Sequence, residues 1–482
     1  MRYKSTRGGV TDVGFTEAVL MGLAPDKGLL VPQSIPKVSA ATLEEWKKLS
    51  FPELSTEIIS LYIDESEITK AELAGLTKRA YSTFRTTEVT PVEDLKGDFK
   101  LLELFHGPTY AFKDVALQFL GVLFELILQK QGGRLTIIGA TSGDTGSSAI
   151  EGIRGKEGVE CFILYPNNRT SKIQEAQMCA VDDANCHAIA LEGAFFDDCQ
   201  KIVKGLFADQ HFHKKHSLGA VNSINWARIV AQIVYYFYAA LKLDAPPCYS
   251  VPTGNFGDVL AGWYAKEMGC PCRGLIVATN SNDILARFFA TGTYKNEGCQ
   301  ETMAPSMDIS ISSNFERFVF HCAGDDTQVL KGLMQTFENT GAFTAPEALW
   351  TKAKSEMFAG SVTEAGIVAT IKKWRGETGY VLDPHTAIGV AAAENLRPQL
   401  GDGPVVCLAC AHHAKFPTAV VKAIGEADLA TVPEEKNLTK LLSVPHRKNL
   451  LANSVNAVVE FVENTMREKE TAAKPAAKKA KA

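Results

Sequence analysis

Leu104-Phe105-His106-Gly107-Pro108-Thr109-Tyr110-Ala111-Phe112-Lys113-Asp114 is a mostly apolar run, turned by one glycine and one proline, with a lysine next to a predicted helix start. A lysine in such surroundings is partly desolvated, which lowers the pKa of its amine and favours the neutral form. A neutral amine can condense with a carbonyl group, and pyridoxal phosphate is the cofactor that such an amine most often serves. The alternative is an ordinary surface lysine, since most lysines are solvated.

A second motif, Ser250-Val251-Pro252-Thr253-Gly254-Asn255-Phe256-Gly257-Asp258, is typical of a strand that turns into a helix. The backbone N–H groups of such a turn converge in front of a helix N-terminus, where they favour a phosphate group. Gly254 and Gly257 allow a close approach, because a Cβ would block either the turn or the anion. Every doubly wound protein has strand-to-helix turns, so this motif alone does not establish phosphate binding.

A third motif spans residues 135–148, where an apolar predicted strand runs into Thr141-Ser142-Gly143-Asp144-Thr145-Gly146 and a helix start. It is not a nucleotide loop of the Walker type, because Gly146 is followed directly by Ser147 without a lysine. The glycine spacing also differs from the dinucleotide fingerprint. What remains is a loop of hydroxyl and amide groups suited to a small carboxylate. The alternative is a simple N-cap formed by Ser142, Asp144 or Thr145.

Length and charge narrow the class of protein. A chain of 482 residues exceeds a single core, so two or three domains are expected. The net charge of −5 is mild and gives no reason to expect a nucleic acid or membrane partner. The N-terminal residues lack an apolar signal core, and no apolar run reaches the length of a membrane span. These features predict a cytoplasmic protein.

The eleven cysteines are scattered, which suits a reducing compartment better than a secreted one. Cys407 and Cys410 have the two-residue spacing of a zinc or redox motif. They lie in or at the end of a predicted buried strand, and residues three apart on a strand point to opposite faces. The sequence therefore predicts free thiols and no metal site.

Alternating strand and helix patterns from Leu101 onward predict an α/β fold with parallel sheets covered on both faces, and sites at the carboxyl ends of the strands. Residues 1–95 are predicted to form an N-terminal accessory domain, 96–440 the catalytic core with a helical excursion near 325–375, 441–467 a helical segment and 468–482 a disordered basic tail. The main predicted strands are Leu135 to Ile138, Cys161 to Tyr165, Cys186 to Leu191, Tyr249 to Val251, Gly274 to Ala278 and Val405 to Ala409.

The three motifs, in their wording and order, resemble those of threonine synthases of the longer fungal and bacterial type. The resemblance covers nearly the whole chain. Further matching stretches are Tyr3-Lys4-Ser5-Thr6-Arg7-Gly8, Gly28-Leu29-Leu30-Val31-Pro32, Tyr81-Ser82-Thr83-Phe84, Asn222-Ser223-Ile224-Asn225-Trp226-Ala227-Arg228, Met307-Asp308-Ile309, Ser312-Ser313-Asn314-Phe315-Glu316-Arg317, Leu382-Asp383-Pro384-His385-Thr386-Ala387, and Ala411-His412 with Ala414-Lys415-Phe416.

This resemblance implies the tryptophan synthase β-like fold of pyridoxal phosphate enzymes (fold type II), with two α/β lobes around the cofactor. Lys113 would bind pyridoxal phosphate covalently and then move protons at the α, β and γ carbons of the substrate. The loop of Ser142, Gly143, Asp144 and Thr145 would take the amino acid carboxylate. The substrate phosphate would meet either Arg317 with Ser313 and Asn314, or Arg228 with Asn225, although each arginine could instead serve a structural ion pair. The implied cofactor contacts are Gly254, Asn255, Phe256, Gly257, Asp258 and Cys410.

Cys410 departs from the family pattern, which usually has a threonine immediately before the Ala-His dipeptide and a proline where this chain has His413. In the family that threonine hydroxyl contacts the pyridine nitrogen of the cofactor. A thiol is a weaker hydrogen-bond partner than a hydroxyl. We therefore expect the cofactor to bind and the reaction to survive, with altered ring electronics.

The reaction implied by the resemblance converts O-phosphohomoserine and water into threonine and phosphate. Two alternatives stay open at this point. One is a related phospho-lyase that eliminates phosphate from another phospho-amino acid without adding water. The other is a non-catalytic protein that keeps the fold and the cofactor. The expected partner is the small-molecule substrate, and the expected assembly is a monomer or homodimer.

Overall fold

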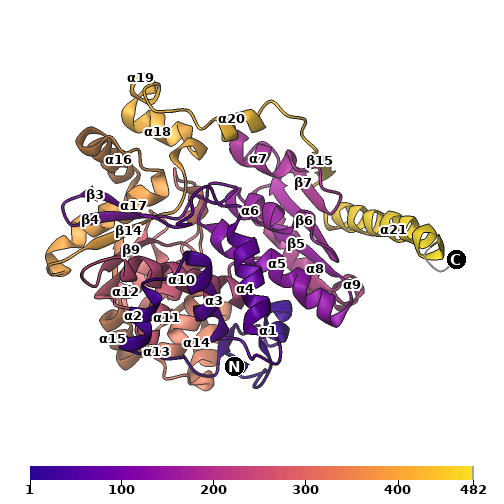
Figure 1. Cartoon of the computed structure of the whole chain (residues 1–482), viewed down its shortest axis with the longest axis horizontal. Coiled ribbons are helices and arrows are strands. Elements are labelled where there is room, and N and C mark those ends of the chain that lie inside the picture. The colour runs from indigo at the N-terminus through magenta and orange to yellow at the C-terminus, as the bar shows by residue number, and fades with distance from the viewer. Residues whose placement is uncertain (480–482) are drawn as a thin grey trace.

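The computed structural model describes residues 1–479, which contain two largely parallel sheets with helices packed around them (Figure 1). The larger, six-stranded sheet has the order β13-β10-β9-β14-β4-β3. Its strands are β3 (Val92–Lys96), β4 (Phe99–Glu103), β9 (Cys248–Pro252), β10 (Gly274–Thr279), β13 (Phe358–Ser361) and β14 (Val405–Ala409). The smaller, five-stranded sheet has the order β15-β7-β6-β5-β8. Its strands are β5 (Leu135–Ala140), β6 (Val159–Pro166), β7 (Cys186–Glu192), β8 (Leu218–Gly219) and β15 (Asn449–Ala452).

All strand pairs in these two sheets are parallel except β3 with β4, which are antiparallel. The six main strands predicted from apolar runs all form, and their ends differ from the prediction by at most two residues. Parallel strands need long crossovers, and here helices supply them. The predicted α/β fold with parallel sheets is confirmed.

Helices and short elements complete the described chain. The helices nearest the site are α5 (Lys113–Gln131), α6 (Asp144–Ile153), α7 (Lys172–Cys179), α10 (Trp226–Leu241), α11 (Gly257–Met268), α13 (Phe315–Cys322) and α17 (Pro384–Leu396). The other helices are α1 (Phe15–Met21), α2 (Ala40–Trp46), α3 (Phe51–Ser60), α4 (Lys70–Tyr81), α8 (Phe196–Ala208), α9 (Gln210–His216), α12 (Ile284–Thr291), α14 (Thr327–Thr340), α15 (Glu347–Glu356), α16 (Glu364–Thr378), α18 (Pro417–Ile424), α19 (Glu426–Leu429), α20 (Lys436–Leu441) and α21 (Val455–Lys479). The remaining elements are β1 (Tyr3–Ser5), β2 (Leu30–Pro32), β11 (Thr293–Lys295), β12 (Ala342–Thr344) and the short turns η1 (Pro305–Met307), η2 (Arg397–Gln399) and η3 (His413–Lys415).

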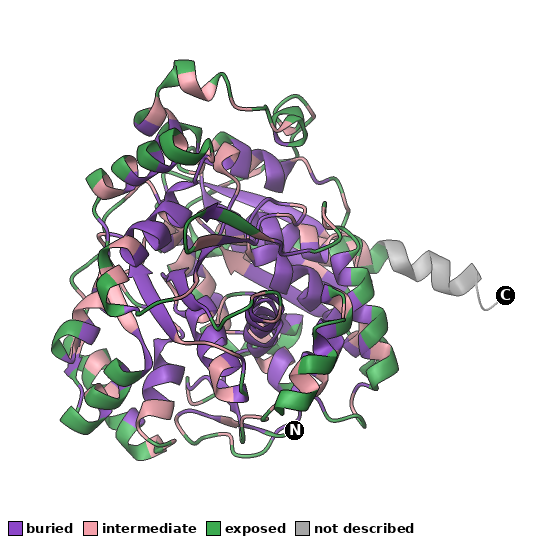
Figure 2. Ribbon diagram, turned by 60° about the vertical axis from the view of Figure 1, so that its left-hand side comes forward, coloured by how far each residue is buried: buried purple, intermediate pink, exposed green. Residues whose placement is uncertain are grey.

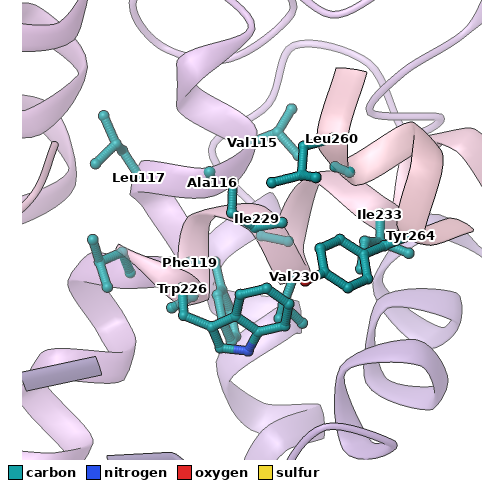
Figure 3. Packing of buried hydrophobic residues seen from close by; sticks show 14 of the residues in the cluster. Val115, Ala116, Leu117, Phe119, Trp226, Ile229, Val230, Ile233, Leu260 and Tyr264 are labelled. Carbon is teal, nitrogen blue, oxygen red and sulfur yellow. The ribbon is translucent and has the colours of Figure 1, made fainter. Parts of the chain in front are cut away.

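Helix α10 lies at the centre of the largest hydrophobic cluster, because it is apolar around most of its circumference. Figure 3 shows Trp226 and Ile229 of α10 among side chains of α5 and α11, such as Phe119 and Tyr264. Figure 2 shows that buried residues fill the sheets and the helices beside them, whereas exposed residues lie on the outer helices. This rigid interior carries the N-terminal ends of α5 and α11, where two of the sequence motifs lie.

The N-terminal segment shares this core. The indole N–H of Trp226 donates to the hydroxyl of Tyr3 at 3.1 Å, and that hydroxyl donates to the carbonyl oxygen of Tyr62 at 2.6 Å. Phe51 packs edge-on against Tyr238 of α10, with ring centroids 5.2 Å apart. Residues 1–81 are therefore held against the central helix by a continuous aromatic cluster.

Three features differ from the sequence prediction. The segment near 325–375 is not only helical, because it contributes β13 at the edge of the larger sheet. The predicted helical segment 441–467 contains β15, which adds a parallel strand to β7. Helix α21 continues to Lys479, so residues 468–479 are helical rather than disordered, as their alanine, lysine and glutamate content favours. Residues 480–482 of the predicted tail lie outside the described residues.

No helix within residues 1–479 is long and apolar enough to span a membrane.

Candidate active site

Lys113 is the first residue of α5, and the loop before it is tied to the end of β14. The backbone N–H of Phe112 donates to the carbonyl oxygen of Cys410 at 2.7 Å, and that of His412 donates to the carbonyl oxygen of Tyr110 at 3.1 Å. Tyr110 has a φ of 60°, a left-handed conformation that turns the chain from β4 toward the helix. These contacts fix Lys113 at the carboxyl end of β14, where ligands of parallel sheets bind.

The amine of Lys113 is buried and has an unusual electrostatic setting. Only 8% of the residue is exposed, and its Nζ lies 3.4 Å from Ser306 Oγ. Burial lowers the pKa of Lys113 to about 8, and although the carboxylate of Asp144 opposes that shift, the charges of Arg228 and Lys415 add to it. A substantial fraction of the amine is thus neutral near physiological pH, as nucleophilic chemistry requires.

The glycine turn after β9 leads into α11 through Phe256, whose φ of 61° is left-handed. None of the described residues accepts a hydrogen bond from the backbone N–H groups of Gly254, Asn255, Phe256 or Gly257. Gly254 is tightly enclosed, since a Cβ there would lie 3.1 Å from Met307 Cα. Four free N–H groups in front of a twelve-residue helix form a site for a phosphate group.

Residues 312–314 support this turn from outside. The hydroxyl of Ser312 donates to the carbonyl oxygen of Gly254 at 2.7 Å, and that of Ser313 donates to Asn255 Oδ1 at 3.1 Å. The backbone N–H and the side-chain amide of Asn314 both donate to the carbonyl oxygen of Asn255, at 3.0 and 3.1 Å. The predicted substrate residues Ser313 and Asn314 thus hold the turn in shape.

Asp258 points into the core and not toward the turn. Its Oδ1 accepts hydrogen bonds from the hydroxyls of Tyr235 and Tyr236, and its Oδ2 is buried without a partner among the described residues. Burial raises the pKa of Asp258 to about 6, against the lowering effect of the two tyrosines. The side chain of Asp258 therefore packs beneath the turn, and the predicted contact of Asp258 with the cofactor stays a prediction that would involve its backbone N–H.

The loop 141–146 at the end of β5 is shaped by Thr141, whose Oγ1 accepts from the N–H groups of Gly143 at 2.9 Å and Gly146 at 2.8 Å. Gly143 has a φ of 153°, and a Cβ there would meet the side chain of Gln174 at 2.3 Å. Ser142 and Thr145 are partly exposed, and their hydroxyls have no hydrogen bond to any described residue. These two side chains are available to a ligand.

Asp144 of the same loop is already engaged. Its Oδ1 lies 2.7 Å from Lys415 Nζ and 2.8 Å from Gln174 Nε2, while its Oδ2 accepts from Ser306 Oγ at 3.1 Å. The charges of Lys415 and Lys113 hold the pKa of Asp144 well below its usual range, despite burial. The Asp144 side chain thus supports the loop from behind, and the predicted binding of a substrate carboxylate by this loop stays a prediction.

Two predicted phosphate ligands are used by the fold. Arg317 is fully buried, and its three nitrogens donate to Leu30 O at 3.0 Å, Asn314 Oδ1 at 2.5 Å and Ile224 O at 2.7 Å. Asn225 caps α10, with its side chain bonded to three backbone groups. Every nitrogen of Arg317 and the side-chain amide of Asn225 thus bond to the fold, and direct contact of either residue with the substrate stays a prediction.

Arg228 keeps a free donor. Its Nη1 donates to the carbonyl oxygen of Val221 at 2.9 Å, but its Nε is buried without a partner among residues 1–479. Burial lowers the pKa of Arg228 to about 10, and its charge acts on Lys113. Of the two predicted arginines, Arg228 alone has a guanidinium nitrogen without a partner among the described residues.

Cys410 lies at the end of β14 with its Sγ 3.7 Å from the carbonyl oxygen of Leu408. Its backbone N–H donates to Thr386 Oγ1 at 3.1 Å, and burial raises the pKa of its thiol well above the usual range. Cys407 belongs to a different hydrophobic cluster from Cys410. In the part of the chain that the structure describes, no three His, Cys, Asp or Glu side chains are grouped to hold a metal ion.

Ser306 and Lys415 are not among the predicted site residues, yet Ser306 contacts Lys113 directly and Lys415 is connected to Lys113 through Asp144 and Ser306. Ser306 follows a proline in an irregular stretch and belongs to no recognisable pattern. Lys415 was noted only as part of a matching stretch. Lys415 could have been predicted as a buried site residue from its apolar neighbours Ala414 and Phe416, the same kind of pattern that indicates Lys113.

The chain matches known families along most of its length. A family model described as "Pyridoxal-phosphate dependent enzyme" matches residues 85–354, which contain the lysine and both loops. The fold and the site thus define a pyridoxal-phosphate-dependent enzyme of fold type II. Models described as "Threonine synthase N terminus" and "Threonine synthase, C-terminal" match residues 2–81 and 386–462.

The chain belongs to the threonine synthase family. It is 47% identical over 460 residues to threonine synthase of Schizosaccharomyces pombe, covering 88% of this chain and 89% of that protein. The crystal structure of PLP-bound threonine synthase from Brucella melitensis is similar with a TM-score of 0.92 and 43% identity, covering 96% of this chain and 99% of that one. Threonine synthase from yeast has a TM-score of 0.92 and 42% identity, covering 97% and 99% of the two chains.

Proposed function

We propose that this protein converts O-phospho-L-homoserine and water into L-threonine and phosphate, with pyridoxal phosphate bound to Lys113. The observation that carries this proposal is the meeting of a buried lysine, whose pKa is lowered to about 8, with a glycine turn of free N–H groups at the same sheet edge. Similarity to threonine synthases over nearly the full length supports the choice of reaction.

The residues present fit pyridoxal phosphate. The free N–H groups of residues 254–257 suit its phosphate, and the enclosed backbone at Gly254 suits a group that needs close approach. Cys410 follows β14, and its carbonyl oxygen accepts from the backbone N–H of Phe112, the residue before Lys113, which suits a place at the pyridine ring. When bound, the cofactor supplies an electron sink for negative charge at the substrate carbons.

Lys113 is the group that moves protons. Its amine is close to half neutral near pH 8, so it can both take and return a proton during turnover. Ser306 lies 3.4 Å from Nζ and orients the nitrogen when it is free. One lysine in this setting serves several successive proton transfers without a second base.

The substrate is held at its two ends. Ser142, Gly143 and Thr145 bind its carboxylate, since two free hydroxyls and a helix N-terminus favour an anion. Arg228 binds its phosphate through the nitrogen that the fold leaves free. Asp144, Ser313 and Asn314 support these groups from behind.

Parallel assays of phosphate release and threonine formation from O-phosphohomoserine test the proposal, with Lys113→Ala as the control. Equal amounts of the two products, abolished in Lys113→Ala, are expected. Phosphate accompanied by a 2-oxo acid and ammonia would instead identify a phospho-lyase. A cofactor-loaded protein that forms neither product would contradict the proposed reaction.

The cytoplasmic location, the monomeric or homodimeric state and the domain division at 95, 440 and 467 stay predictions. A soluble-fraction assay and light scattering of the purified protein test the first two. Limited proteolysis near residues 85–95 tests whether the N-terminal segment can be separated from the core that it shares.

A further inference from the structure

Lys415 is a second buried lysine at the site, and the roles proposed above do not use it. Its side chain has no exposed area and lies in the short turn η3. Its Nζ forms an ion pair with Asp144 Oδ1 at 2.7 Å and donates to the carbonyl oxygen of Thr109, also at 2.7 Å. A buried charge persists only with fixed partners. Lys415 and Asp144 therefore determine each other's position.

Asp144 transmits this constraint to Ser306. One oxygen of the Asp144 carboxylate forms the ion pair with Lys415. The other oxygen accepts a hydrogen bond from the hydroxyl of Ser306 at 3.1 Å. A serine hydroxyl has one proton, so its remaining lone pairs can only accept. Lys113 Nζ donates to them across 3.4 Å. Three successive contacts thus connect the two lysines.

The backbone of Ser306 is fixed as well. Its N–H donates to His385 Nε2 at 3.2 Å, and His385 Nδ1 lies 2.8 Å from Asp383 Oδ1. Its carbonyl oxygen would lie 3.3 Å from a Cβ at Gly254, so it abuts the phosphate turn. The backbone of Ser306 is thereby held between that turn and Lys113, and its hydroxyl is directed by its own contacts with Asp144 and Lys113.

Charged groups of opposite sign surround Lys113, and their effects on the protonation of its amine oppose one another. The titratable groups that act on its amine are Asp144 of α6, Lys415 of η3, Arg228 of α10 and Cys410 at the end of β14. Asp144 favours the protonated amine, whereas Lys415 and Arg228 disfavour it. Without Lys415, an uncompensated carboxylate would face the catalytic nitrogen.

We infer that Lys415 is a positioning residue for Lys113: through Asp144 and Ser306 it fixes the place of the lysine nitrogen and offsets the charge that would keep that nitrogen protonated. This rests on the proposed function only in taking Lys113 as the cofactor lysine. It does not depend on which phosphorylated amino acid is the substrate.

Lys415→Met tests the inference, because it removes the charge and keeps the length of the side chain. In the purified holoenzyme, the pH midpoint at which the absorption of the bound cofactor changes reports the protonation of the Lys113 nitrogen. We expect Lys415→Met to raise this midpoint by about one pH unit and to shift the acidic limb of the kcat/KM profile in the same direction. Lys215→Met removes a surface lysine paired with Glu463 and leaves the midpoint unchanged.

Asp144→Asn gives the opposite sign and keeps the test decisive if Lys415→Met fails to fold. It removes the carboxylate and leaves the charge of Lys415, so the midpoint falls, and the double variant returns it toward the wild-type value. A midpoint in Lys415→Met equal to wild type, or a shift of the same sign in both single variants, overturns the inference. If the midpoint shifts in opposite directions in the two single variants but the wild type forms no threonine, the proposed reaction is contradicted. The inference about Lys415 is then still supported.

Discussion

Phe112 and Cys410 are joined by a backbone hydrogen bond of 2.7 Å, so the residue before Lys113 is anchored to the residue that follows β14. The bridge between Ala111 and Ala411 continues this pairing. Lys113 and the Cys410 thiol consequently keep a fixed relation even though they lie far apart in the sequence. Because this pairing involves backbone atoms only, we expect a change in the side chain at 410 to leave the position of Lys113 unaltered.

Cys410→Thr places a hydroxyl where this chain has a thiol. Because a hydroxyl is the stronger hydrogen-bond partner, we expect the cofactor to remain bound while its absorption maximum shifts and kcat changes by about two- to tenfold. Cys410→Val, which has the shape of threonine without the hydroxyl, is the matched control. Unchanged spectra and turnover in Cys410→Thr would show that this position does not tune the ring.

Gly254→Ala is expected to weaken pyridoxal phosphate binding by about tenfold or more, because overpacking at a rigid site costs about 1–3 kcal/mol. Its Cβ would lie 3.1 Å from Met307 Cα and 3.3 Å from Ser306 O, and both are backbone atoms that cannot rotate away. Gly332→Ala, in helix α14 with nothing within 4 Å of the new Cβ, is the control. Equilibrium titration with the cofactor measures both, and equal affinities would contradict the tight fit at Gly254.

Arg317→Met and Arg228→Met are expected to have different effects. Loss of Arg317 leaves three buried acceptors without a donor, so the free energy of unfolding should fall by about 3 kcal/mol or more. Arg228 has one bond to the fold, so Arg228→Met should mainly raise KM for the phosphorylated substrate. Denaturant unfolding measures the free energy of unfolding of both variants, and steady-state kinetics measure their KM for the phosphorylated substrate. The assignment fails if Arg317→Met raises KM at unchanged stability.

Asp258 gives a prediction for pH. Its pKa is raised to about 6 in the folded protein, above its ordinary value of 3.8, so the folded state holds the proton more tightly than the unfolded state. This contribution to stability is fully present below about pH 3.8 and is lost as pH rises through about 6.

Asp258→Asn abolishes this titration. The difference in unfolding free energy between the variant and wild type should therefore move in favour of the variant by about 2–3 kcal/mol between pH 4 and pH 7. Denaturant unfolding at both pH values measures it. Glu45→Gln, on the surface helix α2, provides a carboxylate control outside the core. A difference that does not vary with pH would mean that Asp258 titrates normally.

The sequence predicts correctly those strands that are marked by a continuous run of neighbouring apolar residues. Strands such as β6 and β14 are buried on both faces, so their apolar runs are continuous, and the lysine and glycine motifs adjoin them directly. Strands β13 and β15 are not predicted because each is only four residues long and all of its residues are half-exposed or exposed.

The direction in which a charged side chain points was not predictable. Asp258 follows a phosphate turn yet binds tyrosines of α10, and Arg317 lies in a motif that resembles a substrate clamp yet holds three segments of the fold together. The contact of Asp144 with Lys415 joins residues far apart in the chain, and nothing in either local sequence indicates it. Such contacts depend on packing, which a single sequence does not reveal.

Strand β15 pairs Asn449 with Ile189 and Ala452 with Glu192, so the smaller sheet is completed by a strand that is translated after every strand of the larger sheet. Until then the edge of β7 stays open, and an open edge is a template for pairing with other chains. During synthesis the smaller sheet therefore lacks its edge strand β15 until all strands of the larger sheet have been translated. Nascent chains stalled before residue 449 should accordingly depend on chaperones, whereas chains in which residues 449–452 have emerged should not.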